Sequence, residues 1–313
     1  MRDRLETHAG RIDVFDSIVM RKIPLLFKPL DGLLGAFFPK PMPGILVTTK
    51  RPLSVQRFTG AHELGHFDLN HEPSLDNEEM LHRSPFSSHP DYGKQELEAD
   101  AFAVEFMMPK WLFALHFRHQ EWTSDHMKQP HVVYQLSLRI GASYEATCRA
   151  LARHKVITSN GLNSLLEVPP RAIKQEVLRG YEPSEWWGDV WTLTERDQGT
   201  AIEGSRSDLF LLRLQEDSGA GYLWTFDQLD RSDFAIVRDE REGPPGETIG
   251  GQVTRWITAE STDRQSGDLI LAERRPWLPH EEPLSILRFH YDLTGPELEG
   301  WSHAERKHFL GAA

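Results

Sequence analysis

Apolar and polar positions alternate with different periods along the chain, and the first fifty residues predict a helix and a small sheet. Residues 11–20 carry apolar side chains at the spacing of an amphipathic helix. Two apolar runs bounded by Pro and Gly, residues 23–27 and 44–49, are typical of strands. A turn followed by a third strand is predicted for residues 30–38. The edge of such a sheet is a place where an extended peptide can add a strand.

Helical spacing dominates the next hundred residues. A helix is predicted to begin after Pro52 and Ser54, because Pro and Ser are common at helix starts. Further helices are predicted for residues 95–109, 111–119, 132–140 and 144–154. Residues 141–143 join the last two helices as a turn, and Ser143 is placed to cap the second of them.

This helix, glycine turn and capped helix form the signature of a helix-turn-helix. Arg139, Arg149 and Arg153 supply positive charge, which favours contact with DNA. Helix pairs of this shape also serve only in packing, and the chain as a whole is acidic. DNA binding is therefore the less favoured interpretation of this segment.

From about residue 183 the pattern changes to short runs with turn signals between them. Strands are expected at residues 208–214, 222–226, 234–237, 253–257, 267–273 and 284–289. Their spacing predicts an all-β sandwich. The sequence therefore predicts a multidomain α+β chain with three parts: residues 1–125, a helical segment at 126–182 and a β domain at 183–313.

Composition narrows the class of protein. The chain has 313 residues, of which 39% are hydrophobic and 26% charged, and these are values of a soluble globular protein. No apolar run approaches the length of a bilayer span, and the charged N-terminus lacks the apolar core of a signal peptide. Cys148 is the single cysteine, so no internal disulfide forms, which fits a reducing cytoplasm. A net charge of −12 argues against strong non-specific binding to nucleic acid.

The motif H-E-x-x-H, formed by His62, Glu63 and His66, is a candidate metal-binding and catalytic site. Two histidines four residues apart lie on one face of a helix, so both imidazoles can reach one metal ion. Zinc suits such ligands, and Glu63 would lie where it can take a proton from a bound water. A solvated helix is the alternative, but the flanking residues are mostly apolar. The motif therefore predicts a zinc site with Glu63 as the general base.

A third ligand is expected on the helix predicted at residues 95–109. The spacing H-x-x-G-x-x-H is absent after His66, which excludes the metzincin arrangement. Glu96 and Asp100 lie on one face of that helix, where Glu96 would bind the metal and Asp100 would orient a ligand histidine. Glu98 is the alternative ligand. All three acids could instead be solvated.

Several separated motifs resemble the ImmA/IrrE-type zinc metallopeptidases. They are the run Leu30–Ala36, Arg57–Thr59 leading into Ala61–His66, and the run from Glu96 through Ala99, Asp100, Phe102 and Ala103 to Pro109. The resemblance covers about the first 125 residues and implies a thermolysin-like core with zinc held by His62, His66 and Glu96. It also implies cleavage of a repressor protein in a stress or mobile-element response. His82, His89 and Tyr92 are candidates for polarising the substrate carbonyl.

Three loops of the β domain resemble those of chagasin-like inhibitors of papain-type cysteine peptidases, which have an immunoglobulin-like fold. The matching positions are Tyr222, Trp224, Gly250, Gly251, Arg275, Pro276 and Trp277. The first loop of that family is N-P-T-T-G-Y-x-W, whereas Ser218, Gly219 and Ala220 replace its Pro and both Thr here. The resemblance implies a partner-binding domain. In the alternative interpretation Tyr222 and Trp224 are core aromatics of the sandwich.

Together these features predict a cytoplasmic, zinc-dependent endopeptidase that cleaves a repressor-like protein and carries a C-terminal partner-binding β domain. The alternative is a protease inhibitor or partner-binding protein with a structural zinc site. A structural site would fill all four positions of the metal and would not need a glutamate in the place of a general base.

Overall fold

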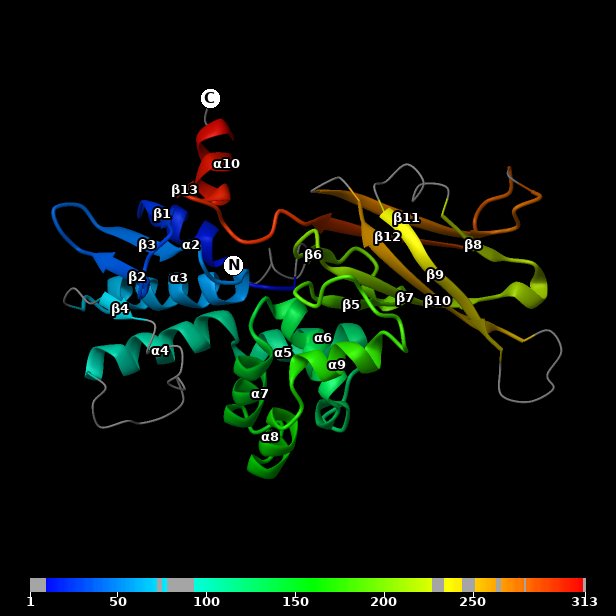
Figure 1. Cartoon of the computed structure of the whole chain (residues 1–313), viewed down its shortest axis with the longest axis horizontal. Coiled ribbons are helices and arrows are strands. Elements are labelled where there is room, and N and C mark those ends of the chain that lie inside the picture. Colours follow the sequence, from blue (N-terminus) through cyan, green and yellow to red (C-terminus); the bar gives the residue numbers. More distant parts are fainter. Residues whose placement is uncertain are drawn as a thin grey trace. The chain divides into compact units, whose positions relative to one another are not determined.

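The structure is a computed structural model that describes residues 10–71, 75–77, 93–226, 234–243, 251–262, 266–278 and 280–311 (Figure 1). The contacts within the chain define two compact units. The five-stranded unit consists of residues 11–115, 136–166 and 296–313, and the two-sheet unit consists of residues 1–10, 116–135 and 167–295. In the described ranges, no helix combines the length and apolar character that a membrane crossing requires.

The five-stranded unit contains a sheet whose strands lie in the order β13-β1-β3-β2-β4. Its strands are β1 (Leu25–Lys28), β2 (Leu33–Phe38), β3 (Gly44–Thr48), β4 (Leu75–Asn77) and β13 (Gly300–Trp301). β1 and β3 are parallel, whereas β2 is antiparallel to β3 and to β4. The three strands predicted near the N-terminus are confirmed.

The helices within this unit are α2 (Val14–Met20), α3 (Leu53–Asp68), α4 (Lys94–Met107), α7 (Tyr144–Arg153), α8 (Ser159–Leu166) and α10 (His303–Gly311). Of these, α2 packs on β1 of the sheet. α3 contacts β2 and β3 as well as α4, so that it lies between the sheet and α4 (Figure 1). Almost every residue of α3 from 56 to 66 is buried. A helix buried on both sides in this way needs a use for its two histidines, because polar side chains are costly to bury.

The ends of α3 differ from the sequence prediction in one detail. The helix begins at Leu53, directly after Pro52, and Ser54 lies inside it. At the other end Asn70 adopts a left-handed φ of 55°, and the N–H groups of Asn70 and His71 donate to the carbonyls of Phe67 and His66 at 3.1 and 2.9 Å. These two bonds form a Schellman motif, which turns the chain back over the last turn of the helix.

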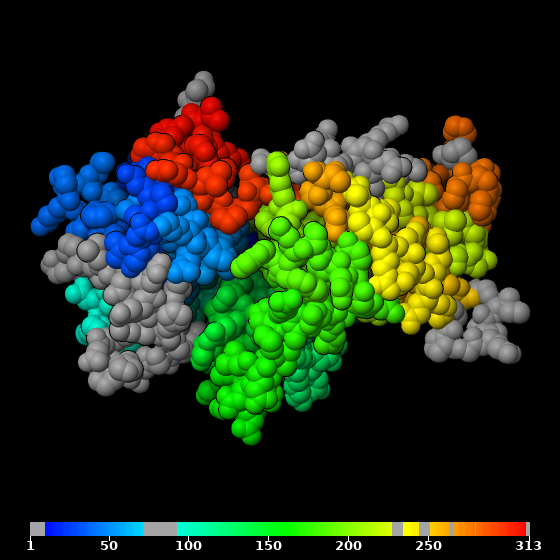
Figure 2. All heavy atoms as spheres, viewed as in Figure 1, coloured from blue at the N-terminus to red at the C-terminus, as the bar shows by residue number. Residues whose placement is uncertain are grey.

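The C-terminal segment returns to this unit. β13 pairs antiparallel with β1 at the edge of the sheet, and α10 packs on α2. The backbone N–H of Leu25 donates to Oε2 of Glu305 at 3.2 Å. Figure 2 shows these red C-terminal residues against the blue N-terminal ones. The sequence assigned β13 and α10 to the β domain, whereas both pack in the five-stranded unit. The predicted domain boundaries themselves stay a prediction.

The two-sheet unit contains two four-stranded sheets with the orders β5-β7-β10-β9 and β6-β12-β11-β8. The strands are β5 (Val190–Leu193), β6 (Ala201–Glu203), β7 (Leu209–Glu216), β8 (Leu223–Thr225), β9 (Phe234–Glu242), β10 (Val253–Ser261), β11 (Ser266–Arg274) and β12 (Ser285–Asp292). The six strands predicted in this region are confirmed. The ring of Phe234 meets Phe210 in its own sheet and Tyr291 in the other sheet, at centroid distances of 5.2 and 5.0 Å, so the two sheets share a core.

Further helices lie between the two strand-rich regions of the sequence: α5 (Lys110–Gln120), the short η2 (His126–Lys128), α6 (Pro130–Ile140) and α9 (Pro170–Val177). Two single 3-10 turns, η3 (Glu195–Asp197) and η4 (Ser218–Ala220), lie within the second of these regions. The predicted helices in this stretch are confirmed. α9 precedes β5 and packs on it.

The predicted helix-turn-helix has the expected backbone. Gly141 has a φ of +77° between α6 and α7, and the side chain of Ser143 accepts a hydrogen bond from the N–H of Ala146 at 3.2 Å. The two arginines of α7 face acids: Arg149 pairs with Glu145 at 2.7 Å, and Arg153 pairs with Glu105 at 3.1 Å. Paired arginines and an apolar inner face favour packing as the use of this segment.

Cys148 lies on that inner face of α7. Its side chain is fully buried, and burial raises the pKa of the thiol to about 12. A thiol with such a pKa is protonated at neutral pH and is a poor nucleophile. The residue therefore serves as a small core side chain, as its position on an apolar helical face indicates.

Candidate metal centre

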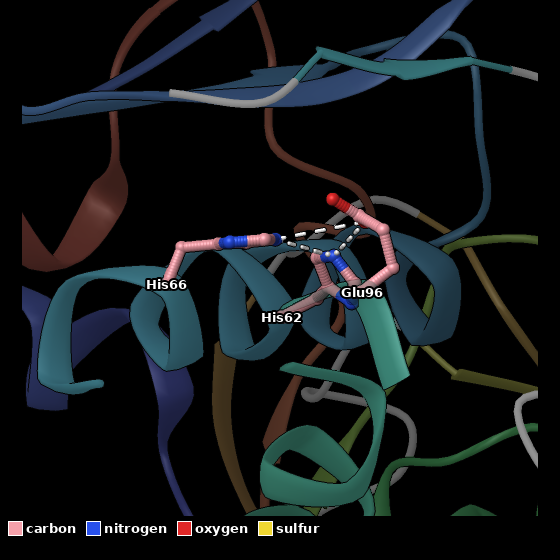
Figure 3. A group of neighbouring side chains, drawn as sticks. All are labelled: His62, His66 and Glu96. Carbon is pink, nitrogen blue, oxygen red and sulfur yellow. Dashed lines mark hydrogen bonds and ion pairs between the residues drawn. The ribbon is translucent and has the colours of Figure 1, made fainter. Parts of the chain in front are cut away.

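The two histidines of the H-E-x-x-H motif face each other across one turn of α3. Their Nε2 atoms lie 3.0 Å apart, and both side chains are buried, with exposed fractions of 2% for His62 and 0% for His66. Figure 3 shows both rings at the same face of the helix. The spacing of four residues, read as one helical turn, thus brings the two rings together.

Glu96 reaches the same point from α4. Its Oε2 atom lies 3.2 Å from Nε2 of His62 and 3.7 Å from Nε2 of His66 (Figure 3). This reach depends on close packing of the two helices. A Cβ atom at Gly65 would lie 3.2 Å from the Cα atom of Ala99 and 3.1 Å from Cδ1 of Phe102, so α4 packs directly against this glycine of α3.

The outer nitrogen of His62 is held by Asp100. Nδ1 of His62 lies 2.9 Å from Oδ1 of Asp100, which is itself buried. A carboxylate acceptor assigns the proton of His62 to Nδ1 and leaves the lone pair of Nε2 directed at Glu96 and His66. The structure thus places Asp100 where the sequence analysis expected the residue that orients a ligand histidine.

The outer nitrogen of His66 meets a residue that the sequence analysis did not consider. Nδ1 of His66 lies 3.0 Å from Nδ1 of His71, and Nε2 of His71 lies 3.2 Å from Oε2 of Glu98. Glu98, the alternative third ligand, is therefore bound to His71 and does not join the cluster. The sequence contains one signal for this contact, which is Asn70 just after the helix. Asn often ends a helix in the left-handed conformation, and this conformation turns the next residue, His71, back over the helix.

The donor set and its spacing fit a metal ion. His62, His66 and Glu96 form the one group of potential ligands found within the described part of the chain, with all ligand atoms within 4.8 Å of one another. Zinc binds imidazole nitrogen and carboxylate oxygen at about 2.0–2.2 Å, so two ligands of a tetrahedral zinc ion lie about 3.3 Å apart. The observed separations of 3.0, 3.2 and 3.7 Å bracket that value. Two nitrogens and one carboxylate leave one tetrahedral position open, as in catalytic sites.

Glu63 follows His62 in α3 and is fully buried. β2 passes close to its carboxylate: a Cβ atom at Gly35 would lie 2.8 Å from Oε1 of Glu63. The absence of a side chain at residue 35 therefore leaves room for the carboxylate. The role of Glu63 as a general base, and the roles of the three ligands, stay predictions.

Several of the predicted site residues are not described by the structure. His82, His89 and Tyr92 lie outside the described residues, and so does Gly250. Gly251 lies just before β10 and is half-buried.

Trp224 is buried, and its Nε1–H donates to the carbonyl of Gln215 at 2.7 Å, which agrees with the interpretation of this residue as a core aromatic.

The first and third loops of the predicted partner-binding set meet at one place. The guanidinium of Arg275 lies 4.5 Å from the ring centroid of Tyr222, and its Nε–H donates to the carbonyl of Ala220 at 3.3 Å. Gly221, with a φ of +82°, lies against the indole of Trp277. Trp277 is 63% exposed, and Pro276 beside it is exposed as well. A large exposed aromatic ring beside a cation is the composition of many binding surfaces.

A known family model matches one part of the chain. Residues 21–152 match the peptidase family model described as the IrrE N-terminal-like domain. The region that holds α3 and α4 is therefore a metallopeptidase-like domain, and a peptidase family implies a protein substrate. No curated protein matches the chain.

Two solved structures are similar to the C-terminal region. One is the cysteine protease inhibitor EhICP2 from Entamoeba histolytica, with 23% sequence identity over 34% of this chain and 96% of that chain and a TM-score of 0.31. The other is Amebosin, with 20% identity over 33% of this chain and 96% of that chain and a TM-score of 0.28.

Proposed function

We propose that the chain is a zinc-dependent endopeptidase. The observation that carries the proposal is the convergence of Nε2 of His62, Nε2 of His66 and Oε2 of Glu96 at separations of 3.0 to 3.7 Å. The buried side chain of Glu63, which directly follows His62 in α3, supports a catalytic use over a structural one, because a structural zinc site has no need of a base.

In this proposal each residue has one task. His62, His66 and Glu96 hold the zinc ion, and Asp100 fixes the ring of His62. Bound zinc acts as a Lewis acid that makes water more acidic and polarises a carbonyl group. Glu63 accepts a proton from the water that attacks the scissile carbonyl and then delivers it to the leaving amine.

The finer parts of the proposal concern the fold and the substrate. We propose a thermolysin-like core for the five-stranded unit, supported by H-E-x-x-H on one helix and a ligand glutamate on the next. We also propose that the substrate is a repressor-like regulatory protein in a stress or mobile-element response and that the protein acts in the cytoplasm. The family match at residues 21–152 supports a protein substrate, and the single buried cysteine is compatible with the compartment.

For the two-sheet unit we propose an immunoglobulin-like sandwich that binds a protein partner through its loops. The contact of Arg275 with Tyr222 and the exposed ring of Trp277 beside Gly221 support this proposal. Inhibition of papain by the full chain, compared with that by Trp277→Ala, tests it. Inhibition that is weakened in the variant is expected, and equal inhibition by both proteins would exclude these loops.

The variant Glu63→Gln tests the proposed peptidase. The zinc content and the cleavage of a peptide library, followed by mass spectrometry, are measured for wild type and for the variant. We expect one zinc ion in both proteins and a loss of cleavage of about 100- to 10,000-fold in the variant, because a general base contributes that much. Glu105→Gln, on the exposed side of α4, is the matched control. Equal cleavage by Glu63→Gln would contradict the proposal, and wild type that binds zinc without cleaving would favour the structural-zinc alternative.

A further inference from the structure

His71 and Glu98 are joined to the metal centre but do not belong to its ligands. The chain leaves α3 through the Schellman motif centred on Asn70, and this motif brings the residue after Asn70 over the last turn of the helix. That residue is His71, and the residue beneath it is His66. Their ring centroids lie 5.0 Å apart at an interplanar angle of 72°.

In the two hydrogen bonds that link His66 to His71 and His71 to Glu98, the donor is each time the residue nearer to the cluster. Nε2 of His66 faces the cluster, so the proton of this ring belongs on Nδ1, which lies 3.0 Å from Nδ1 of His71. Nδ1 of His71 must then accept, and its own proton belongs on Nε2. That atom lies 3.2 Å from Oε2 of Glu98, which accepts it. Each contact in this series has one donor and one acceptor.

His71 is not placed to bind the same metal ion. Its Nδ1 atom meets the outer nitrogen of His66, on the side of the ring that faces away from His62 and Glu96. The side chain of His71 is only 7% exposed, whereas that of Glu98 is 45% exposed. An imidazole held almost fully inside the protein and bonded at both nitrogens is suited to fixing the orientation of its neighbour.

We propose that His71 and Glu98 form a positioning arm, which holds the ring of His66 and its tautomer in the form that binds zinc. This inference rests on the metal site of the proposed function, though not on peptidase activity. Asp100 does the same for His62 with a single carboxylate, since it touches that ring directly. α4 then supplies one ligand, Glu96, and the carboxylate that supports each of the two histidines.

The physical effect follows from the hydrogen bonds of the arm. A hydrogen bond at Nδ1 keeps the Nε2 lone pair available and removes the entropy of ring rotation before the metal arrives. Loss of such a partner lowers metal affinity by about 10- to 100-fold in known metal sites. The arm ends on a partly exposed carboxylate, so we expect a smaller effect at Glu98 than at His71.

Zinc affinity, measured by competition with a chromophoric chelator, tests the arm on the full-length protein. His71→Ala removes the acceptor, and we expect zinc affinity to fall by about 10-fold or more. His71→Asn places an amide oxygen near the former Nδ1 atom and should restore most of the affinity. Glu98→Gln should weaken zinc binding by less than His71→Ala. Glu105→Gln, another acid of α4 that pairs with Arg153, is the control and should bind zinc as wild type does.

Two further readouts separate positioning from a structural role. The absorption spectrum of the cobalt-substituted protein at saturation should change in His71→Ala and remain close to wild type in His71→Asn. The unfolding of the metal-free protein should be the same in both variants.

Three results would overturn the arm: unchanged zinc affinity in His71→Ala, equal loss in His71→Ala and His71→Asn, or a second zinc ion per chain that disappears with His71. Absence of zinc from wild type would instead refute the proposed function.

Discussion

Gly65 of α3 lies against Ala99 of α4, because a Cβ atom at residue 65 would lie 3.2 Å from the Cα atom of Ala99 and 3.1 Å from Cδ1 of Phe102. The two helices therefore pack closely at Gly65, where an added side chain would meet both Ala99 and Phe102. This contact sets how far Glu96, one turn before Ala99, can reach toward the histidines of α3. We therefore expect zinc binding at the proposed site to depend on the absence of a side chain at residue 65.

Gly65→Val should separate the two helices. Overpacking of this kind costs about 1–3 kcal/mol of unfolding free energy, and the displaced Glu96 should lower zinc affinity as well. Urea unfolding and chelator competition measure the two effects. Gly161→Val is the matched control, because a Cβ atom at this helical glycine meets its nearest neighbours only at 3.5 and 3.7 Å. Equal zinc affinity in both variants would show that Gly65 does not set the position of Glu96.

Gly35→Ala should impair cleavage while zinc stays bound. The new Cβ atom would lie 2.5 Å from Cγ2 of Thr59, 2.8 Å from Oε1 of Glu63 and 2.9 Å from the carbonyl oxygen of Leu46, and such contacts are too short to persist. Because the backbone of β3 cannot give way easily, Glu63 and β2 must move. A displacement of about 1 Å at a catalytic group costs about 100-fold in rate.

The rate of peptide cleavage and the zinc content of Gly35→Ala measure this effect. Gly44→Ala is the control, since a Cβ atom at this glycine in β3 meets only the carbonyl oxygen of Pro24, at 3.8 Å. Cleavage at the wild-type rate in Gly35→Ala would mean that Glu63 has room to move without loss of function.

Much of the five-stranded unit follows from local sequence patterns. The spacing of His62 and His66 predicts their meeting because helix geometry alone determines it. The short strands near the N-terminus are bounded by Pro and Gly, which mark strand ends clearly. The assignment of Glu96 over Glu98 needed both the resemblance to a family and the face of the helix shared with Asp100.

The parts that sequence patterns missed depend on long-range contacts. β13 has only two residues, Gly300 and Trp301, which carry no periodicity, and it pairs with a strand more than 270 residues away in the sequence. For Trp224 the sequence left a core position and a loop position open, because alternation next to a turn cannot distinguish the two. His71 was missed because its role depends on the backbone turn at Asn70 and on a helix that follows later in the chain.

Gln56→Ala should detach the C-terminal segment. The amide of Gln56 is fully buried: its Nε2 atom donates to the carbonyls of Thr48 and Glu297, both at 3.1 Å, and its Oε1 atom accepts the N–H of Glu297 at 2.8 Å. The substitution leaves three buried backbone groups without this partner, and each such group costs about 1–3 kcal/mol. We expect a loss of about 3 kcal/mol or more of unfolding free energy.

Urea unfolding measures this loss, and limited proteolysis followed by mass spectrometry should show faster release of residues 296–313. Gln215→Ala is the control, because that amide makes a surface contact with Thr254 and its loss should change stability by less than about 0.5 kcal/mol. Unfolding of Gln56→Ala at the wild-type urea concentration would contradict the importance of this contact.

The stability of the two-sheet unit should fall with rising pH because of Asp208. Burial and the neighbouring carboxylate of Asp189 raise the pKa of Asp208 from 3.8 to about 6, although Asp208 accepts hydrogen bonds from Ser205 and Trp191. The folded state therefore holds the proton of Asp208 more tightly than the unfolded state does. The stability that this group contributes is fully present below its unfolded pKa and is lost as the pH rises through about 6.

Asp208→Asn removes the titration, because an amide does not ionise in this range. The difference in unfolding free energy between wild type and variant should therefore change by about 2–3 kcal/mol between about pH 4 and about pH 7. The unfolding free energy of wild type should fall relative to that of the variant as the pH rises. Urea unfolding followed by tryptophan fluorescence measures it, since Trp191 donates to this carboxyl. Gln215→Ala, which removes an exposed amide that does not titrate, should keep a constant difference from wild type. Parallel pH profiles of wild type and Asp208→Asn would mean that Asp208 ionises as readily in the folded chain as in the unfolded one, which its burial beside Asp189 opposes.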